Sequence, residues 1–211
     1  YNTTGCYNNF FGYYGGYYNT TGCHNNFFGD RAGFSNTTGN DNNFFGRDAG
    51  CDQTTRNNNV AIGYSVQLPN TTGSNQLVIG VGASAWINGD SSFNVGIGTT
   101  NPTSKLHVIG EVTATDYNST SDARLKNNIQ IIDDPLEKVL QINGVSFNWI
   151  EDNRPSLGVI ADNIQEILPE LVSDTDPKTV NYNGLIGLLI EVVKEQQAQI
   201  ESLNERLTKL E

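Results

Sequence analysis

The sequence has no methionine, only three cysteines and few basic residues, and each shortage excludes a class of protein. Three cysteines are too few for a disulfide framework. With 12 Lys and Arg against 23 Asp and Glu, the net charge of −11 argues against nucleic-acid binding, which needs cations to replace phosphate counterions. The longest apolar run, residues 185–193, is interrupted by Glu191, so no membrane insertion is expected. Because the chain opens within a repeat and lacks Met, we interpret it as a portion of a longer protein, and no signal peptide can be identified.

A 17-residue repeat is the strongest feature that is present. Asn-Thr-Thr-Gly begins at residues 2, 19, 36 and 70, with the degenerate Gln-Thr-Thr-Arg at 53. Asn-Phe-Phe-Gly begins at residues 9, 26 and 43, and becomes Val-Ala-Ile-Gly at 60 and Leu-Val-Ile-Gly at 77. A further unit, Val95-Gly96-Ile97-Gly98, follows with a one-residue slip.

Each repeat holds one short apolar strand between turn signals, too little to bury itself, so repeats must stack on their neighbours. We therefore expect an all-β shaft over residues 1–100, either a β-solenoid or an intertwined β-prism, made from three chains. The Val-Ala-Ile-Gly and Val-Gly-Ile-Gly units resemble the head repeats of trimeric adhesins and the shafts of phage tail fibres. Alternating segments 104–109 and 111–115 around Gly110 predict paired strands, which would form a β neck within the linker 101–120.

Cys6 and Cys23 occupy the same repeat position. A small residue buried within each repeat is the favoured interpretation, and a disulfide between successive repeats is the alternative. His24 and His107 each stand alone, whereas a metal site needs three or four ligands, so neither a metal nor another cofactor is expected.

Residues 121–211 predict a compact α+β domain. Asp134-Pro135 is a helix start, with an acid at the N-cap and Pro at the first helical position. Alternation over residues 145–149 predicts a half-buried strand after a turn at Asn143-Gly144, and residues 151–156 are expected to be a polar loop. A second helix should stop at Pro169, and Val180 with Tyr182 is expected to form a short strand.

The last 28 residues, 184–211, show a heptad pattern typical of a coiled coil. Seven of the eight a and d positions are apolar, and the stripe comprises Ile186, Leu189, Val193, Gln196, Ile200, Leu203, Leu207 and Leu210. Ile at a with Leu at d favours a dimer, whereas the upstream repeats favour a trimer, and we expect a homotrimer. The alternative is an amphipathic helix packed on its own domain.

The region 119–211 also resembles a known family, the C-terminal intramolecular chaperone of phage endosialidase tailspikes, a self-releasing serine peptidase. The matching residues lie in the same order along the chain: Ser121-Asp122, Arg124-Leu125-Lys126, Ile129, Phe147, Trp149, Gly158-Val159-Ile160-Ala161, Leu168-Pro169-Glu170-Leu171-Val172, Tyr182, Leu188-Leu189-Ile190-Glu191 and Lys194-Glu195-Gln196-Gln197.

This resemblance implies a cut between Thr120 and Ser121, with Ser121 as nucleophile and Lys126 as general base. Asp122 and Arg124 are candidate supporting residues, for which a structural role such as a helix cap is favoured. Five residues on a regular helix place two side chains about 140° apart, so Ser121 and Lys126 cannot meet on one helical face. An acyl shift followed by hydrolysis and direct hydrolysis give the same products, and both stay open.

The resulting hypothesis is a phage tail fibre in the virion, assembled in the bacterial cytoplasm, whose C-terminal chaperone trimerises the chains, drives folding of the shaft and is then cut off. Its partners would be two copies of itself, the rest of the phage tail and a host surface receptor, either a glycan or an outer-surface protein. The alternative is a trimeric cell-surface adhesin with an uncleaved C-terminal clamp. A glycan-cleaving spike is disfavoured, because residues 1–120 hold only seven acids and no convergent pair.

Overall fold

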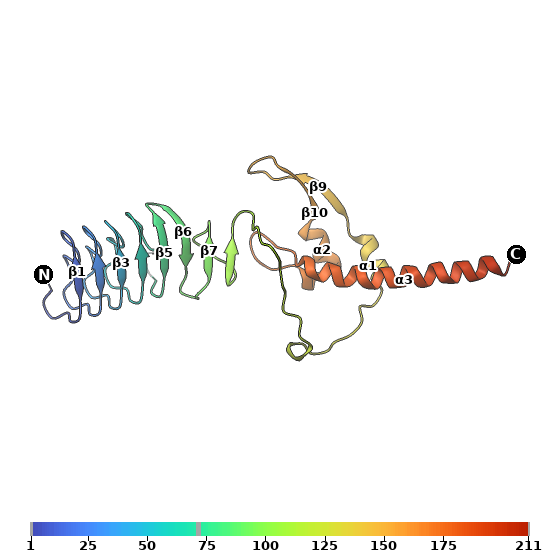
Figure 1. Cartoon of the computed structure of the whole chain (residues 1–211), viewed down its shortest axis with the longest axis horizontal. Helices are drawn as coiled ribbons and strands as arrows, with labels where there is room; N and C mark the ends of the chain where they lie inside the picture. Colours follow the sequence, from blue (N-terminus) through green and yellow to red (C-terminus); the bar gives the residue numbers. More distant parts are fainter. Residues whose placement is uncertain (1, 71–72, 211) are drawn as a thin grey trace. The chain divides into compact units, whose positions relative to one another are not determined.

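The computed structural model of this chain describes residues 2–70 and 73–210, drawn as ribbons in Figure 1. The chain divides into two compact units, one ending at Tyr117 and the other beginning at Asn118.

The first unit is a stack of short strands joined into one sheet, and it contains no helix among the residues described. The strands are β1 (Asn9–Phe11), β2 (Asn26–Phe28), β3 (Asn43–Phe45), β4 (Val60–Ile62), β5 (Leu77–Val81), β6 (Ser84–Gly89), β7 (Val95–Ile97) and β8 (Leu106–Val108). Strands β1 to β5 pair in parallel, each residue with the one 17 positions later, as in Asn9 with Asn26. We call each 17-residue turn of this stack a rung. Because the strands pair within one chain, the β-solenoid is confirmed over the intertwined prism.

Stacked phenylalanines form the core of the first rungs. Phe27 and Phe44 are fully buried, and the rings of Phe10, Phe27 and Phe44 follow one another at 5.0 and 5.1 Å between centroids. Gly33 lies against the Phe27 ring with a φ of +59°, and a Cβ there would stand 2.5 Å from ring carbons. The repeated glycine therefore supplies both a left-handed backbone and the space that the ring occupies.

Buried asparagines form hydrogen-bonded ladders beside the phenylalanines. The Asn42 side chain donates to the Arg56 carbonyl at 2.6 Å, and its Oδ1 accepts from the backbone and side-chain nitrogens of Asn59 at 3.1 and 3.0 Å. Asn25 has the same role in the preceding rung, where it accepts from Asn42. A buried amide without partners is costly, so these ladders hold successive rungs in register.

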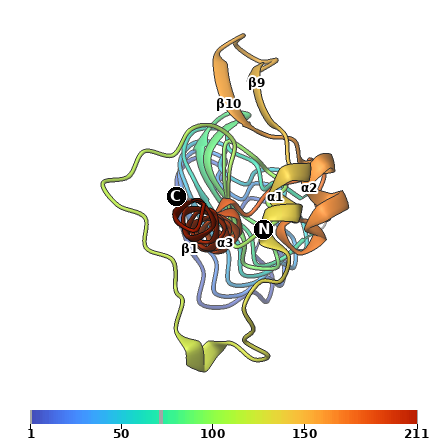
Figure 2. The same ribbon diagram turned by 90° about the vertical axis from the view of Figure 1, so that its right-hand side faces the viewer.

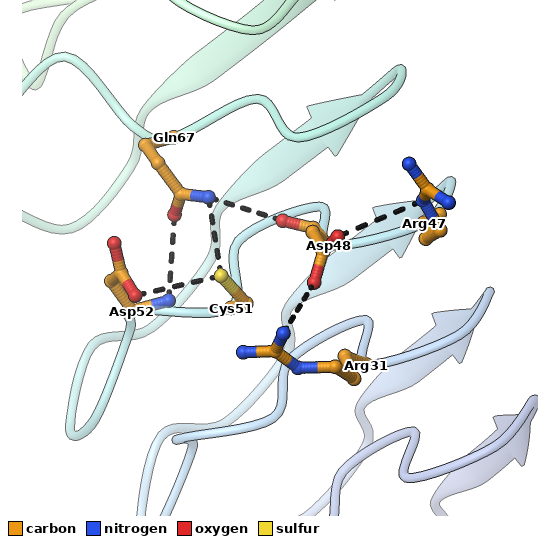
Figure 3. A network of polar contacts seen from close by, with 6 residues as sticks. All are labelled: Arg31, Arg47, Asp48, Cys51, Asp52 and Gln67. Carbon is orange, nitrogen blue, oxygen red and sulfur yellow. Dashed lines mark hydrogen bonds and ion pairs between the residues drawn. The ribbon is translucent and has the colours of Figure 1, made fainter.

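Charged residues stand in the second and third rungs where the first rung has Tyr13 and Tyr14, and they form a polar network with residues of the fourth rung (Figure 3). The Asp48 carboxylate lies between Arg31 at 3.4 Å and Arg47 at 3.8 Å. Gln67, which takes the place of the repeated glycine, donates its side-chain amide to the Asp48 carbonyl at 3.1 Å and to the Cys51 sulfur at 3.4 Å. Side-chain contacts thus continue the stack where the Asn-Thr-Thr-Gly signal decays.

The one-residue slip before Val95 accompanies a reversal of strand direction. Strand β6 pairs antiparallel with both β5 and β7, and parallel stacking resumes between β7 and β8. The predicted pairing of residues 104–109 with 111–115 is wrong: β8 pairs with β7, and residues 111–115 form no strand. Strand β8 therefore extends the same sheet, at an offset of 11 residues from β7.

The second unit combines helices with one hairpin. Its elements are η1 (Ala123–Leu125), α1 (Pro135–Gln141), β9 (Gly144–Asn148), β10 (Pro155–Val159), α2 (Ala161–Ile167), η2 (Pro169–Leu171) and α3 (Tyr182–Thr208). Its buried core is small among the described residues and lies between α1, α2 and α3. It contains Ile164, Leu168, Leu188 and Val192. The antiparallel hairpin β9–β10 projects away from these helices (Figure 1, Figure 2).

Several local predictions for this unit are confirmed and others need correction. Helix α1 starts at Pro135 as predicted, but Asp134 is left-handed and its side chain makes no cap hydrogen bond. Strand β10 begins at Pro155, inside the segment predicted to be a loop. Val180 makes a single bridge to Val172, whereas Tyr182 begins α3 instead of extending a strand, because the Asn181 side chain caps the helix by accepting from Asn183 N.

Candidate functional site

Ser121 and Lys126 lie in contact in the segment that joins the start of the second unit to α1. The Lys126 ammonium donates to the Ser121 hydroxyl oxygen at 2.7 Å. Between them the chain makes only the short 3-10 turn η1, and Lys126 returns to extended backbone with φ −127° and ψ 148°. The 140° separation expected on a regular helix therefore does not keep the two side chains apart, because no α-helix forms here.

Asp122 sets the geometry of this turn. Its carboxylate accepts from the Arg124 backbone N–H at 2.8 Å and from the Arg124 guanidinium at 2.6 Å. The hydrogen bond from the Arg124 side chain has the largest effect on the pKa of Asp122, followed by the one from the Arg124 backbone. Together they hold that pKa below its ordinary value. Asp122 thus caps the turn in its charged form, and Arg124 pairs with it.

The residues before the implied cut contact the start of α3. The Asn183 side chain donates to the Ser119 hydroxyl at 3.0 Å, one residue before Thr120. Asn183 was absent from the sequence-based set of site residues. No periodicity marks it, and its partner lies 64 positions away in the chain.

The whole segment is exposed in a single chain. Every residue from Glu111 to Ile131 is exposed, Thr120, Ser121 and Lys126 among them. The hydroxyl and the amine are therefore close together but open to water. Within residues 2–70 and 73–210, no group of three or more His, Cys, Asp or Glu side chains could hold a metal ion.

Helix α3 has two apolar faces with different surroundings. Leu188 and Val192 are buried in the unit's own core. All seven apolar members of the heptad stripe are exposed, from 49 % for Leu189 to 84 % for Leu210. From Gln196 to Leu210 every residue is exposed, so this half of α3 has no packing partner in the described residues of the chain. Across residues 2–70 and 73–210, no helix has the length and hydrophobicity to cross a membrane.

Comparison with known proteins finds a family match that begins at Ser121. Residues 121–173 match the peptidase S74 family, described as the chaperone of endosialidase. The matched residues all lie in the second unit. The match begins at Ser121 and confirms the resemblance on which the site assignment depends.

Relatives of this chain are found among phage tail proteins. The chain is 31 % identical over 113 residues to the long tail fiber protein Gp37 of Enterobacteria phage K3, covering 48 % of this chain and 9 % of the relative. Gp37 of Enterobacteria phage T2 is 31 % identical over 113 residues, covering 48 % and 8 %. Gp37 of Escherichia phage AR1 is 37 % identical over 87 residues, covering 36 % and 8 %. The chain thus spans less than a tenth of the length of these three relatives, which are components of phage virions.

Proposed function

We propose that this chain is the C-terminal portion of a homotrimeric phage tail fibre, in which the chaperone domain assembles three chains and then cuts itself from the shaft between Thr120 and Ser121. The observation that carries the proposal is the 2.7 Å contact between Ser121 and Lys126, located at the first residue of the family match. The shaft would connect to the rest of the phage tail and meet a glycan or protein on the host surface.

The proposed reaction uses the hydroxyl that follows the bond to be cut. Ser121 Oγ attacks the Thr120 carbonyl carbon, its proton passes to Lys126 Nζ, and the C–N bond breaks as that proton moves to the Ser121 nitrogen. Thr120 is then held as an ester on Ser121, and water hydrolyses the ester. The products are a shaft ending at Thr120 and a chaperone beginning at Ser121.

Lysine accepts a proton only when it is neutral, and its ordinary pKa is about 10.4. Burial disfavours the charged amine and lowers that pKa. Lys126 is exposed in the single chain, so we infer that other chains of the trimer cover it. Cleavage would then follow assembly, because only the assembled chaperone supplies the environment that a lysine base requires.

The heptad stripe supplies the assembly step. Its seven apolar side chains are exposed along a face of α3 distinct from Leu188 and Val192, as an unpaired coiled-coil strand would present them. Joining three chains at this end raises their local concentration and fixes their register. A long parallel stack is slow to nucleate, so alignment of the chains before the shaft folds limits aggregation.

The test is the mass of the purified full chain. Wild type should give a fragment beginning at Ser121, whereas Ser121→Ala should remain full length. Lys126→Arg keeps the charge but cannot act as a base at neutral pH, so it should also remain full length. Ser121→Thr keeps a hydroxyl nucleophile and serves as the matched control, with slower cleavage expected.

Two outcomes would overturn the autoprotease. The first is a Ser121→Ala chain that is cut at the same bond. The second is a wild-type chain that forms trimers and stays uncut, which would favour the adhesin with a C-terminal clamp.

A further inference from the structure

We propose that Cys6 and Cys23 form a disulfide that joins the first two rungs of the solenoid. Their sulfur atoms lie 2.7 Å apart, with both residues as free thiols in this structure. Cys6 is exposed and Cys23 is half-buried, so the expectation that both are small buried residues is wrong for Cys6. The pair is therefore open to reagents in solution.

The stacking of the rungs gives the pair the geometry of a cross-link. Three residues further along, Asn9 and Asn26 face each other in a parallel register. Neighbouring strands lie about 4.8 Å apart, within the range of about 4.4 to 6.8 Å over which disulfides join two Cα atoms. Bond formation thus requires little movement of the backbone.

The same position in later rungs shows what the cysteines replace. Cys23 N donates to Asn40 Oδ1 at 2.8 Å, and Asn40 N donates to Asn57 Oδ1 at 2.8 Å. Between the first two rungs the acceptor is sulfur instead, with Cys6 N donating to Cys23 Sγ at 3.0 Å. Sulfur is a weak acceptor, so the first two rungs of this chain have the weaker hydrogen bond at this position. A covalent bond at that position compensates for it.

The chemistry needs an oxidant, and we name a small disulfide such as oxidised glutathione. The thiolate of one cysteine attacks this disulfide and releases one reduced thiol. The second cysteine then attacks the mixed disulfide and releases another. Two protons and two electrons leave the protein, and the oxidant is reduced to two thiols. Because the cytoplasm keeps thiols reduced, oxidation would follow release of the virion; this timing rests on the proposed function, whereas the bond itself does not.

Cys51 provides an internal control. Its rung neighbours at positions 34 and 68 are Phe34 and Leu68, so no cysteine stacks against it. Burial, with the Asp52 carboxylate beside it, raises the pKa of the Cys51 thiol to about 11. Figure 3 shows its sulfur between Asp52 and Gln67. Thiolate is the reactive form, so Cys51 should remain a thiol under conditions that oxidise the pair.

The experiment treats the purified full chain with oxidised glutathione, denatures it without reductant, and labels free thiols with a maleimide. Mass spectrometry should find one label, on Cys51, and a peptide that links Cys6 to Cys23 and separates on reduction. Cys51→Ser should keep the link and take no label. Cys23→Ser lacks the second thiol, so Cys6 should keep a glutathione adduct instead of a link, with one label on Cys51. Circular dichroism should show that this variant folds.

Cleavage near Cys6 by an added protease supplies a second measurement. Closing a loop of this length should slow opening of the first rung by about a hundredfold, and reductant should restore the faster rate. Three labelled thiols after oxidation at pH 7 and at pH 9 would overturn the proposal, as would links between different chains. Both results can be read whether or not the chain cuts itself at Ser121, so the two proposals can fail separately.

Discussion

In the solenoid, Phe27 and Phe44 are buried against residues of the adjoining rungs of the same chain, whereas in α3 the apolar residues of the heptad stripe are exposed. Among residues 2–70 and 73–210, eight buried apolar residues make up the solenoid core, and four make up the core of the second unit. The hairpin β9–β10 repeats the contrast, with Leu157 exposed to 80 %. The first unit buries a core within one chain, whereas the second unit leaves its heptad stripe exposed.

This difference assigns the two units different tasks. A stack of rungs grows by nearest-neighbour contacts, once a first pair of rungs has formed. An exposed heptad stripe gains its stability only when copies meet. Under the proposed function, the second unit would start assembly, and the first unit would persist after cleavage.

The largest effect is expected at the heptad stripe. Ile200→Asp with Leu203→Asp places charges where the coiled coil would be dry, and should weaken association at least about a hundredfold, to monomers at micromolar concentration. Ser202→Asp adds an acid on another face of α3 and should leave the assembly intact. Analytical ultracentrifugation of the full chain separates the two. A double variant that sediments like wild type would show that the heptad stripe does not join the chains.

The next effect is expected within a rung. Gly33→Ala would place a Cβ 2.5 Å from the Phe27 ring at φ +59°, and should lower the free energy of unfolding by about 3 kcal/mol. Gly82→Ala has a φ of +58° but nothing within 4 Å, and should cost only about 1 kcal/mol. Urea unfolding of both variants measures the difference. Equal losses would mean that ring packing does not limit the stack.

A smaller effect is expected from the asparagine ladders. Asn42→Ala removes four hydrogen bonds and leaves buried partners unpaired, which should cost about 2 kcal/mol. Asn9→Ala removes one exposed contact to Asn26 and should cost less than about 0.5 kcal/mol. Thermal unfolding compares the two variants. A larger loss of stability in Asn9→Ala would mean that surface contacts, and not the buried ladders, hold the rungs in register.

The smallest effect is expected at the 3-10 turn beside Ser121. The pKa of Asp122 is lowered by the Arg124 side chain, so the turn should be stable above the ordinary Asp pKa of about 3.9 and be lost as pH falls through the lowered value. The Arg124 amide shift in NMR spectra should follow this loss. In Asp122→Asn the pH dependence should disappear. A turn that persists to the same degree at pH 2 would show that the carboxylate does not hold it.

The sequence predicted most features that follow from the 17-residue repeat. It predicted few features that depend on contacts between residues far apart in the chain. The 17-residue step predicted the parallel rungs, because identical residues such as Asn9 and Asn26 stack on each other. It did not predict the reversed strand β6, whose residues follow no repeat. Pro135 marked the start of α1, but the hairpin partner β10 lies in a segment with no clear alternation.

The candidate site shows the same limit. Helical geometry excluded a contact between Ser121 and Lys126 only on the face of one regular helix, and the structure shows that Asp122 closes a single 3-10 turn between them. The contact of Asn183 with Ser119 joins residues 64 positions apart, and no local pattern contains it. Spacing can identify a motif, but the backbone between its members decides whether they meet.

The common register of the rungs also bears on how such shafts evolve. Each rung from β1 to β5 offers its successor the same pattern of backbone groups, at a fixed offset of 17 residues. A gene duplication or deletion of one whole unit therefore leaves both flanking surfaces able to join. The length of the rod can change in steps of one rung through recombination, while the sequences at its two ends stay as they are.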